Sequence, residues 1–116
     1  MNWFRIAAIS GFFSVALGAF GAHALKSSLT PEAMHTFQTG NFYHFIHTIA
    51  LFGVALLLRQ KPSLWPWPAY CFVAGIFLFS GSLYGLAITH YHWLGAITPI
   101  GGLFFLAGWL GLALTP

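Results

Sequence analysis

The sequence predicts an all-α polytopic membrane protein, a bundle of four transmembrane helices that forms one domain over residues 1–116. Hydrophobic residues make up 59% of the chain and charged residues only 4%, far below the charged content of soluble globular domains. Four apolar stretches are each long enough to cross a hydrocarbon core, which takes about 20 helical residues. Every charged side chain lies at an end of these stretches or between them, as expected because a charge at the centre of a membrane helix costs about 3 kcal/mol.

The first predicted span covers residues 4–24 and begins beside Arg5. A cleaved signal peptide is the alternative for this stretch, because Ala22, His23 and Ala24 match the small-x-small pattern of a cleavage site. The stretch is longer than the apolar region of a signal peptide, which is about 7 to 15 residues. This length favours a retained transmembrane helix.

A short interfacial helix is predicted between the first two spans, over residues 31–39. Thr30 can cap this helix, Pro31 suits its first position and Glu32 complements its amino-terminal dipole. The second span is expected over residues 41–58.

The third and fourth spans are predicted over residues 66–88 and 94–114. The pair Thr98 and Pro99 repeats the helix-start pattern, so we expect the fourth helix to be regular only from Pro99. Residues 94–98 then enter the membrane less regularly, and a simple proline kink is the alternative. Aromatic residues near the span ends are typical of anchors at the headgroup level: Trp3, Trp65, Trp67, Tyr91 and Trp93.

Small residues at a spacing of four predict close helix packing in lipid. They are Ser10, Ser14, Gly18 and Ala22 on the first span, and Gly81 and Gly85 on the third.

The cations are distributed unequally between the two ends of the predicted bundle. Arg5, Arg59 and Lys61 share one side with the amino terminus, whereas the other side has Lys26 alone. The positive-inside rule therefore predicts that both termini are cytoplasmic. Because these cations form no basic patch, we expect no nucleic-acid partner.

Polar side chains collect in the half of the bundle that is distant from the termini. They are His23, Tyr43, His44, His47, Ser80, Ser82, Tyr84 and Thr98. Intramembrane polar residues usually face the bundle interior, where they form a functional site or join helices by hydrogen bonds of about 0.6 kcal/mol each. If the fourth helix begins near Pro99, its exposed amides together with Gly101 and Gly102 could also receive a polar or anionic headgroup.

The residue types restrict the possible chemistry. The chain has one glutamate and no aspartate, so neither paired carboxylates nor a Ser-His-Asp triad can form within one copy. We therefore predict no catalytic residues and favour a non-enzymatic protein. His44 and His47 share one helix face and could, with His23, provide nitrogen ligands for a metal or haem, although this signal is too weak to predict a cofactor.

Four segments of the sequence are recognisable together. They are Gly18-Ala-Phe-Gly-Ala-His23, Gln38-Thr39-Gly40 with Tyr43 and His47, Phe79-Ser-Gly-Ser-Leu-Tyr84, and Thr98-Pro-Ile-Gly-Gly102 followed by Gly108-Trp109. With these segments the chain resembles the YgdD-like family of unknown function, which comprises small bacterial inner-membrane proteins and has a human transmembrane relative. The resemblance implies a four-helix protein of the bacterial plasma membrane without an established activity. His44, His90 and His92 lie outside the pattern of this family.

The leading hypothesis is a small inner-membrane protein whose polar cluster binds a lipid or isoprenoid headgroup or docks a larger membrane complex. The predicted ligand-binding residues are His23, Gln38, Tyr43, His47, Ser80, Ser82, Tyr84, Thr98, Gly101 and Gly102. The expected partners are membrane lipids, with a homo-oligomer or a larger complex as further possibilities. One alternative is a redox accessory protein that binds haem, metal or quinone through His23 and His47. A small channel or exporter is the other, and the scarcity of polar residues in the cytoplasmic half disfavours it.

Overall fold

The computed structural model describes residues 1–116 and contains only helices and their connections. Nine helical segments follow one another along the chain: α1 (Trp3–Val15), η1 (Ala16–Gly21), α2 (Ala22–Leu25), α3 (Pro31–Gln60), α4 (Trp67–Gly75), η2 (Ile76–Ser80), α5 (Gly81–Thr89), η3 (His92–Ala96) and α6 (Thr98–Ala113). They join into four long apolar helices, Trp3–Leu25, Pro31–Gln60, Trp67–Thr89 and His92–Ala113, each long enough to cross a membrane. The predicted fold class is therefore confirmed.

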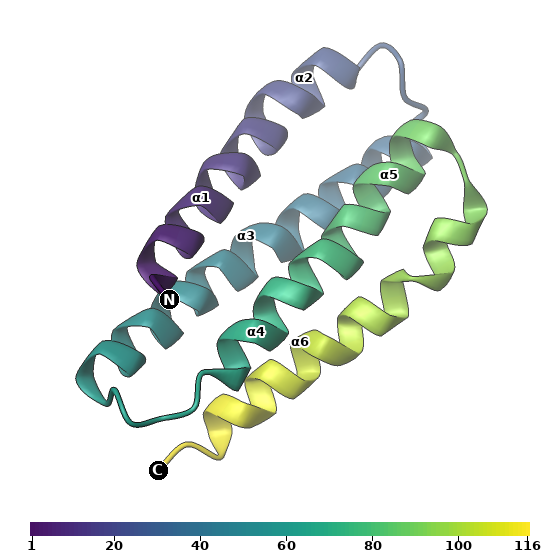
Figure 1. Cartoon of the computed structure of the whole chain (residues 1–116). Coiled ribbons are helices and arrows are strands. Elements are labelled where there is room, and N and C mark those ends of the chain that lie inside the picture. The colour runs from purple at the N-terminus through teal and green to yellow at the C-terminus, as the bar shows by residue number, and fades with distance from the viewer.

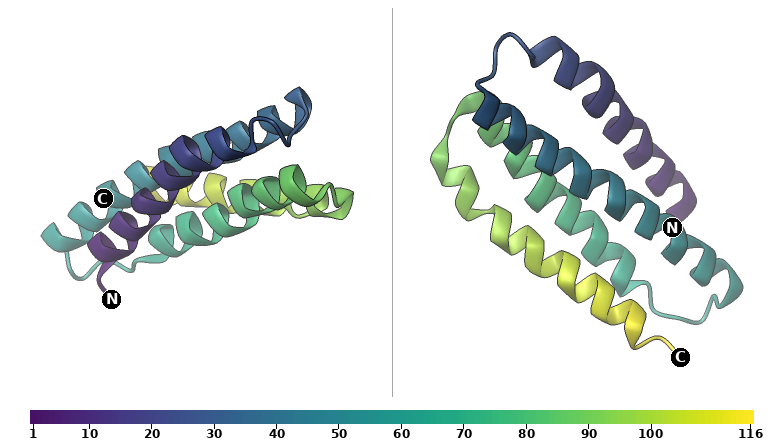
Figure 2. Two further views of the ribbon diagram at one scale, coloured as in Figure 1. Left: turned by 90° about the horizontal axis from the view of Figure 1, so that it is seen from above. Right: turned by 180° about the vertical axis from the view of Figure 1, so that it is seen from behind.

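The four long helices lie roughly side by side, in the order α1, α3, α4–α5 and α6 (Figures 1 and 2). Both termini and the connection between α3 and α4 lie at one end of the bundle, which we call the terminal end. The connections that follow α2 and α5 lie at the opposite end, the distal end.

The predicted interfacial helix and the predicted second span are one helix. Residues 31–39 form the first turns of α3, which continues without interruption for 30 residues to Gln60. Thr30 caps this helix as expected, because its hydroxyl accepts a hydrogen bond from the amide of Ala33 at 3.1 Å. Gly40 alone does not end the helix, since it is buried against Leu83 and the backbone of Ser80. A lone glycine costs a helix only about 1 kcal/mol, which this packing can offset.

The irregular entry into the fourth span is confirmed. Residues His92–Ala96 form a 3₁₀ turn, and α6 is regular only from Thr98. Pro99 occupies the start of α6, where its missing amide hydrogen leaves no helical hydrogen bond unmade.

Two π-helical turns widen the membrane helices, η1 between α1 and α2 and η2 between α4 and α5. Such turns insert an extra residue and rotate the helix faces that follow them. After η1, Gly21 lies against the Phe37 ring of α3.

The closest contact between helices is the one that α6 makes with the α4–η2 segment. A side chain at Gly101 would overlap the backbone of Phe79 and lie 2.7 Å from the carbonyl carbon of Leu78. Gly108 and Gly111 similarly leave room for the rings of Phe72 and Trp67. In contrast, α1 buries only Trp3, Ala7 and Ser14, and its span is the least buried of the four long helices.

Candidate functional site

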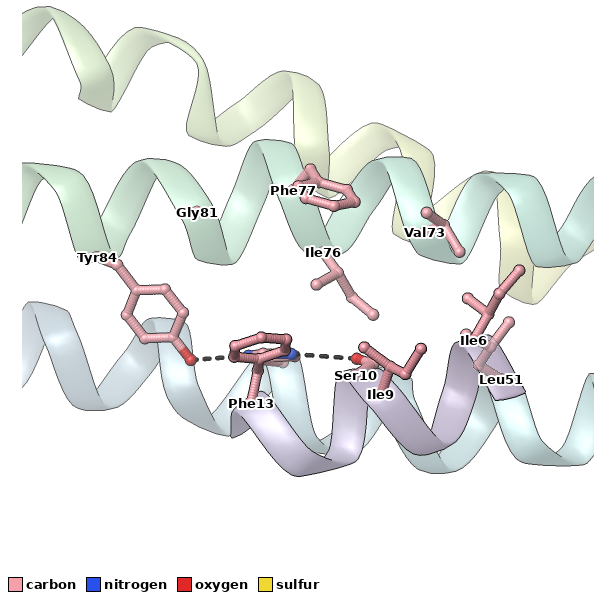
Figure 3. Close-up of a pocket in the computed structure, with 11 residues that line it drawn as sticks. Ile6, Ile9, Ser10, Phe13, Leu51, Val73, Ile76, Phe77, Gly81 and Tyr84 are labelled. Carbon is pink, nitrogen blue, oxygen red and sulfur yellow. Dashed lines mark hydrogen bonds between the residues drawn. The ribbon is translucent and has the colours of Figure 1, made fainter. Parts of the chain in front are cut away.

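A cavity of about 400 Å³ lies between α1 and the α4–η2–α5 helix, with α3 beneath it (Figure 3). We call it the lateral cavity. Its lining consists of Ile6, Ile9, Ser10, Phe13, His44, Leu51, Val73, Ile76, Phe77, Gly81 and Tyr84. Ile9, Phe13 and Phe77 are 52%, 53% and 73% exposed, so the cavity opens to the surroundings of the protein. In a membrane helix bundle these surroundings are hydrocarbon.

A gap remains between α1 and the α4–η2–α5 helix because α1 packs mainly on α3. Near the terminal end, Trp3 of α1 contacts Tyr70 of α4, with their ring centroids 4.9 Å apart. Farther along, bulky side chains of η2, including Ile76 and Phe77, line the gap without reaching α1 closely enough to close it.

The polar floor of the lateral cavity is centred on His44 of α3, a side chain that is only 5% exposed. Its Nε2 lies 3.1 Å from the Ser10 hydroxyl of α1, and its Nδ1 lies 2.9 Å from the Tyr84 hydroxyl of α5. In Figure 3 the hydroxyls of Ser10 and Tyr84 face each other across the floor of the cavity, each at the end of a dashed hydrogen bond. One histidine thus connects three transmembrane helices.

The hydrogens of this network can be assigned, because each hydroxyl donates only once. Thr48 donates to the backbone carbonyl of His44 at 2.8 Å, so its oxygen accepts from Ser10 at 2.6 Å. Ser10 has then used its hydrogen and accepts from the Nε2–H of His44. A neutral imidazole has one N–H, so Nδ1 accepts from the Tyr84 hydroxyl.

Asn41 completes the network one turn away on α3. Its amide nitrogen donates one hydrogen to the Tyr84 oxygen at 3.1 Å and the other to the backbone carbonyl of Ser14 at 2.8 Å. Every side-chain hydrogen-bond donor in this series therefore has an acceptor. The series runs from Asn41 through Tyr84, His44 and Ser10 to Thr48. We call the set of Ser10, Asn41, His44, Thr48 and Tyr84 the His44 network.

The local sequence explains how the network assembles. Asn41, His44 and Thr48 are spaced by three and four residues, so they share one face of α3. Ser10 and Ser14 share a face of α1 in the same way. Tyr84 is held from its other side by Phe37, whose ring centroid lies 5.0 Å away.

His47 belongs to a separate contact between α3 and α6. Its ring stacks on Phe105 with the centroids 3.5 Å apart, and its Nε2 accepts a hydrogen bond from the indole N–H of Trp109 at 3.0 Å. The Nδ1–H of His47 therefore donates to the backbone carbonyl of Tyr43 at 2.7 Å. His44 and His47 are thus opposite neutral tautomers, and all four of their ring nitrogens are occupied.

The hydrogen bonds of His44 and His47 leave no ring nitrogen free to bind a metal or haem iron. Nowhere in the structure do three or more His, Cys, Asp or Glu side chains gather in a way that could hold a metal ion. A metal on His47 would have to replace a hydrogen bond to Trp109 or to the Tyr43 carbonyl. His23, the other histidine of that hypothesis, is exposed on α2.

Comparison with known proteins places the chain in a family. Residues 17–102 match a family described as protein of unknown function, DUF423. The chain belongs to this family. It is 47% identical to the UPF0382 inner membrane protein YgdD of Escherichia coli K12, over 89% of this chain and 79% of that protein.

Two further relatives are similar to the chain over most of their length. The chain is 44% identical to a UPF0382 membrane protein of Haemophilus influenzae, over 97% of this chain and 90% of the relative. It is also 40% identical to the UPF0382 membrane protein YwdK of Bacillus subtilis, over 90% and 87% of the two chains. No solved structure matches. The chain is therefore a membrane protein of a family without an assigned activity.

The residues predicted to form one polar cluster lie at three separate helix contacts in this DUF423 protein. Tyr84 belongs to the His44 network, whereas Tyr43 and His47 lie at the contact with α6. Ser82 and Thr98 form a hydrogen bond of 2.6 Å between α5 and the start of α6. Each of these groups joins two or more helices.

The remaining predicted residues are not brought to the lateral cavity. His23 and Gln38 are exposed near the distal end of this DUF423 protein, and Ser80 is fully buried without a hydrogen-bond partner. Gly101 is buried against the backbone of Phe79, and its neighbour Gly102 lies in ordinary contact with the Phe79 ring.

Sequence reasoning did not predict most of the His44 network. The small-residue spacing indicates only helix packing for Ser10. His44 is one of the polar residues expected in the distal half but lies outside the family pattern, and no motif includes Asn41 or Thr48. The spacing of Asn41, His44 and Thr48 on one helix face was the available signal. Three polar residues along one stripe of an apolar helix indicate a buried hydrogen-bonded face.

Proposed function

We propose that this protein is a non-enzymatic membrane protein whose lateral cavity holds the apolar chain of one membrane lipid, with the polar end of the chain at the His44 network. The observation that carries the proposal is a cavity of about 400 Å³ with a mainly apolar lining that opens between long apolar helices. Its volume lies in the range of small-molecule sites, about 300 to 1,000 Å³. An acyl or isoprenoid chain is the available occupant in a bilayer.

The directions of the hydrogen bonds argue against a hydrolase. Ser10 and His44 resemble a nucleophile and its base, since their side chains lie 3.1 Å apart. However, the Nε2 of His44 already carries a hydrogen, and the Ser10 hydrogen points to Thr48. His44 therefore cannot accept the Ser10 proton without reversal of the network, and this geometry favours binding over catalysis.

Filling the lateral cavity tests the proposal. Gly81 lines the cavity, and a Cβ at this position would meet nothing closer than the Ile76 carbonyl at 3.9 Å. Gly81→Leu is therefore expected to preserve the fold and to reduce co-purified lipid about tenfold, which corresponds to about 1.4 kcal/mol. Native mass spectrometry of the protein, extracted gently from its membrane, measures the retained lipid.

The matched control is Gly53→Leu. Gly53 is an exposed glycine of α3 with no atom near its added Cβ, and it does not line the cavity. This variant should retain lipid as the unmodified protein does. Equal retention by the Gly81→Leu variant would reject the lateral cavity as the lipid site.

We also propose that the terminal end of the bundle faces the cytoplasm. This orientation is supported by Arg5, Arg59 and Lys61 at that end, against Lys26 at the other. Lys61 there donates to the carbonyl of Pro116 at 2.7 Å, and Arg59 lies over the Phe4 ring at 4.2 Å.

Reporter fusions in Escherichia coli test the orientation. Alkaline phosphatase, which is active only outside the cytoplasm, is expected to be inactive when fused after Pro116 and active when fused after Ser28, in the connection between α2 and α3. The reverse pattern would show that both termini face outward.

A further inference from the structure

We infer that the lateral cavity selects a lipid alcohol, because its polar floor offers one hydrogen-bond acceptor, the Ser10 oxygen, and no free donor. The inference rests on the proposed lipid site and adds the chemical class of the ligand. It distinguishes a hydroxyl group from the phosphate and carbonyl groups that other membrane lipids and quinones carry.

The donors of the floor are all used within the protein. Three lining side chains carry polar hydrogens, and each hydrogen already has an acceptor: Ser10 donates to Thr48, His44 to Ser10, and Tyr84 to His44. A ligand oxygen that can only accept hydrogen bonds would therefore find no partner here. An unpaired polar group in a site without water is strongly unfavourable.

Acceptor capacity does remain. The Ser10 oxygen receives one hydrogen bond, from His44, and a hydroxyl oxygen can accept two. The Tyr84 oxygen already accepts from Asn41, and a phenol oxygen has one in-plane lone pair, so Tyr84 has no acceptor capacity left. Ser10 lines the cavity, so a hydroxyl at the end of an apolar chain can donate to its oxygen.

A phosphate group is disfavoured for a second reason. The side chains that line the cavity carry no cation, and the lysines and arginines lie at the ends of the spans. A charged headgroup drawn into this apolar site would lose its hydration without gaining a counter-charge.

The experiment compares farnesol with farnesyl methyl ether, which share one chain and differ in the ability to donate a hydrogen bond. Each probe is titrated into the full-length protein in lipid nanodiscs, and native mass spectrometry measures the bound fraction. We expect farnesol to bind about tenfold more tightly than the ether and more tightly than farnesyl phosphate. Equal affinity of alcohol and ether, or preference for the phosphate, would overturn the inference.

Replacing Ser10 identifies the atoms responsible. Ser10→Ala removes the acceptor and leaves the Nε2–H of His44 free to donate. The ether and the alcohol can then both accept this hydrogen, so the preference for farnesol should disappear. Ser63→Ala, the same substitution in the exposed connection between α3 and α4, should keep the full preference. Persistence of the preference in the Ser10→Ala variant would also overturn the inference.

The outcomes separate this inference from the proposed function. Binding of both farnesyl probes without preference, blocked by Gly81→Leu, retains the lipid site and rejects its selectivity. Failure of every probe to bind, together with unchanged lipid retention in the Gly81→Leu variant, rejects the lipid site itself.

Discussion

Gly101→Ala is expected to lower the free energy of unfolding by about 3 kcal/mol, at the upper end of the range for overpacked cores. The added methyl group would overlap the backbone of Phe79 and lie 2.7 Å from the carbonyl carbon of Leu78. Backbone atoms cannot rotate away as a side chain can, so α6 and η2 must separate. Thermal unfolding in detergent, followed by the tryptophan fluorescence of the bundle, measures the loss.

The neighbouring glycine supplies the control. A Cβ at Gly102 would lie 3.8 Å from the Phe79 ring, which is ordinary van der Waals contact. Gly102→Ala should therefore be neutral or stabilising, since alanine favours the helix by about 1 kcal/mol over glycine. Equal destabilisation by the two substitutions would contradict the close contact between α6 and η2.

His44→Leu is expected to lower the free energy of unfolding by about 2 to 3 kcal/mol. Leucine fills a similar space but leaves the Tyr84 hydroxyl without its acceptor and the Ser10 oxygen without its donor. Each buried group that loses its partner costs about 1 to 3 kcal/mol, although single hydrogen bonds between membrane helices average only about 0.6 kcal/mol. Unfolding of the variant in increasing concentrations of sodium dodecyl sulfate measures the change.

Two further variants make this prediction specific. His35→Leu removes an exposed histidine from the same helix and should change stability little. In the double variant of His44→Leu with Tyr84→Phe, the two losses should be less than additive, because both remove the same hydrogen bond. Strict additivity would show that His44 and Tyr84 contribute independently.

The sequence was sufficient to predict the four membrane helices because the length of an apolar run and the position of a charge are read directly from the order of residues. The Thr98-Pro99 start of α6 was also predicted, since proline acts on the local backbone. The continuity of α3 through Gly40 was not, because that glycine is held by contacts with Ser80 and Leu83, which lie far along the chain.

The partners of the polar residues depend on how each helix is rotated, which a sequence reveals only coarsely. The π turns η1 and η2 change this rotation partway along two helices. Gly101 illustrates a different difficulty. A glycine can make room for a bound headgroup or for the backbone of a neighbouring helix, and the sequence alone does not distinguish the two. Only the position of Phe79 distinguishes these roles.

The link that His44 makes between three helices has a consequence for biogenesis. Once α1 and α3 have entered the bilayer, Ser10, Ser14, Asn41 and Thr48 can already pair, but the Nδ1 of His44 still lacks its donor. That donor, Tyr84, emerges from the ribosome only with the third span. We therefore expect the newly made hairpin of α1 and α3 to remain adjustable in register until the arrival of α5 completes the set of bonds.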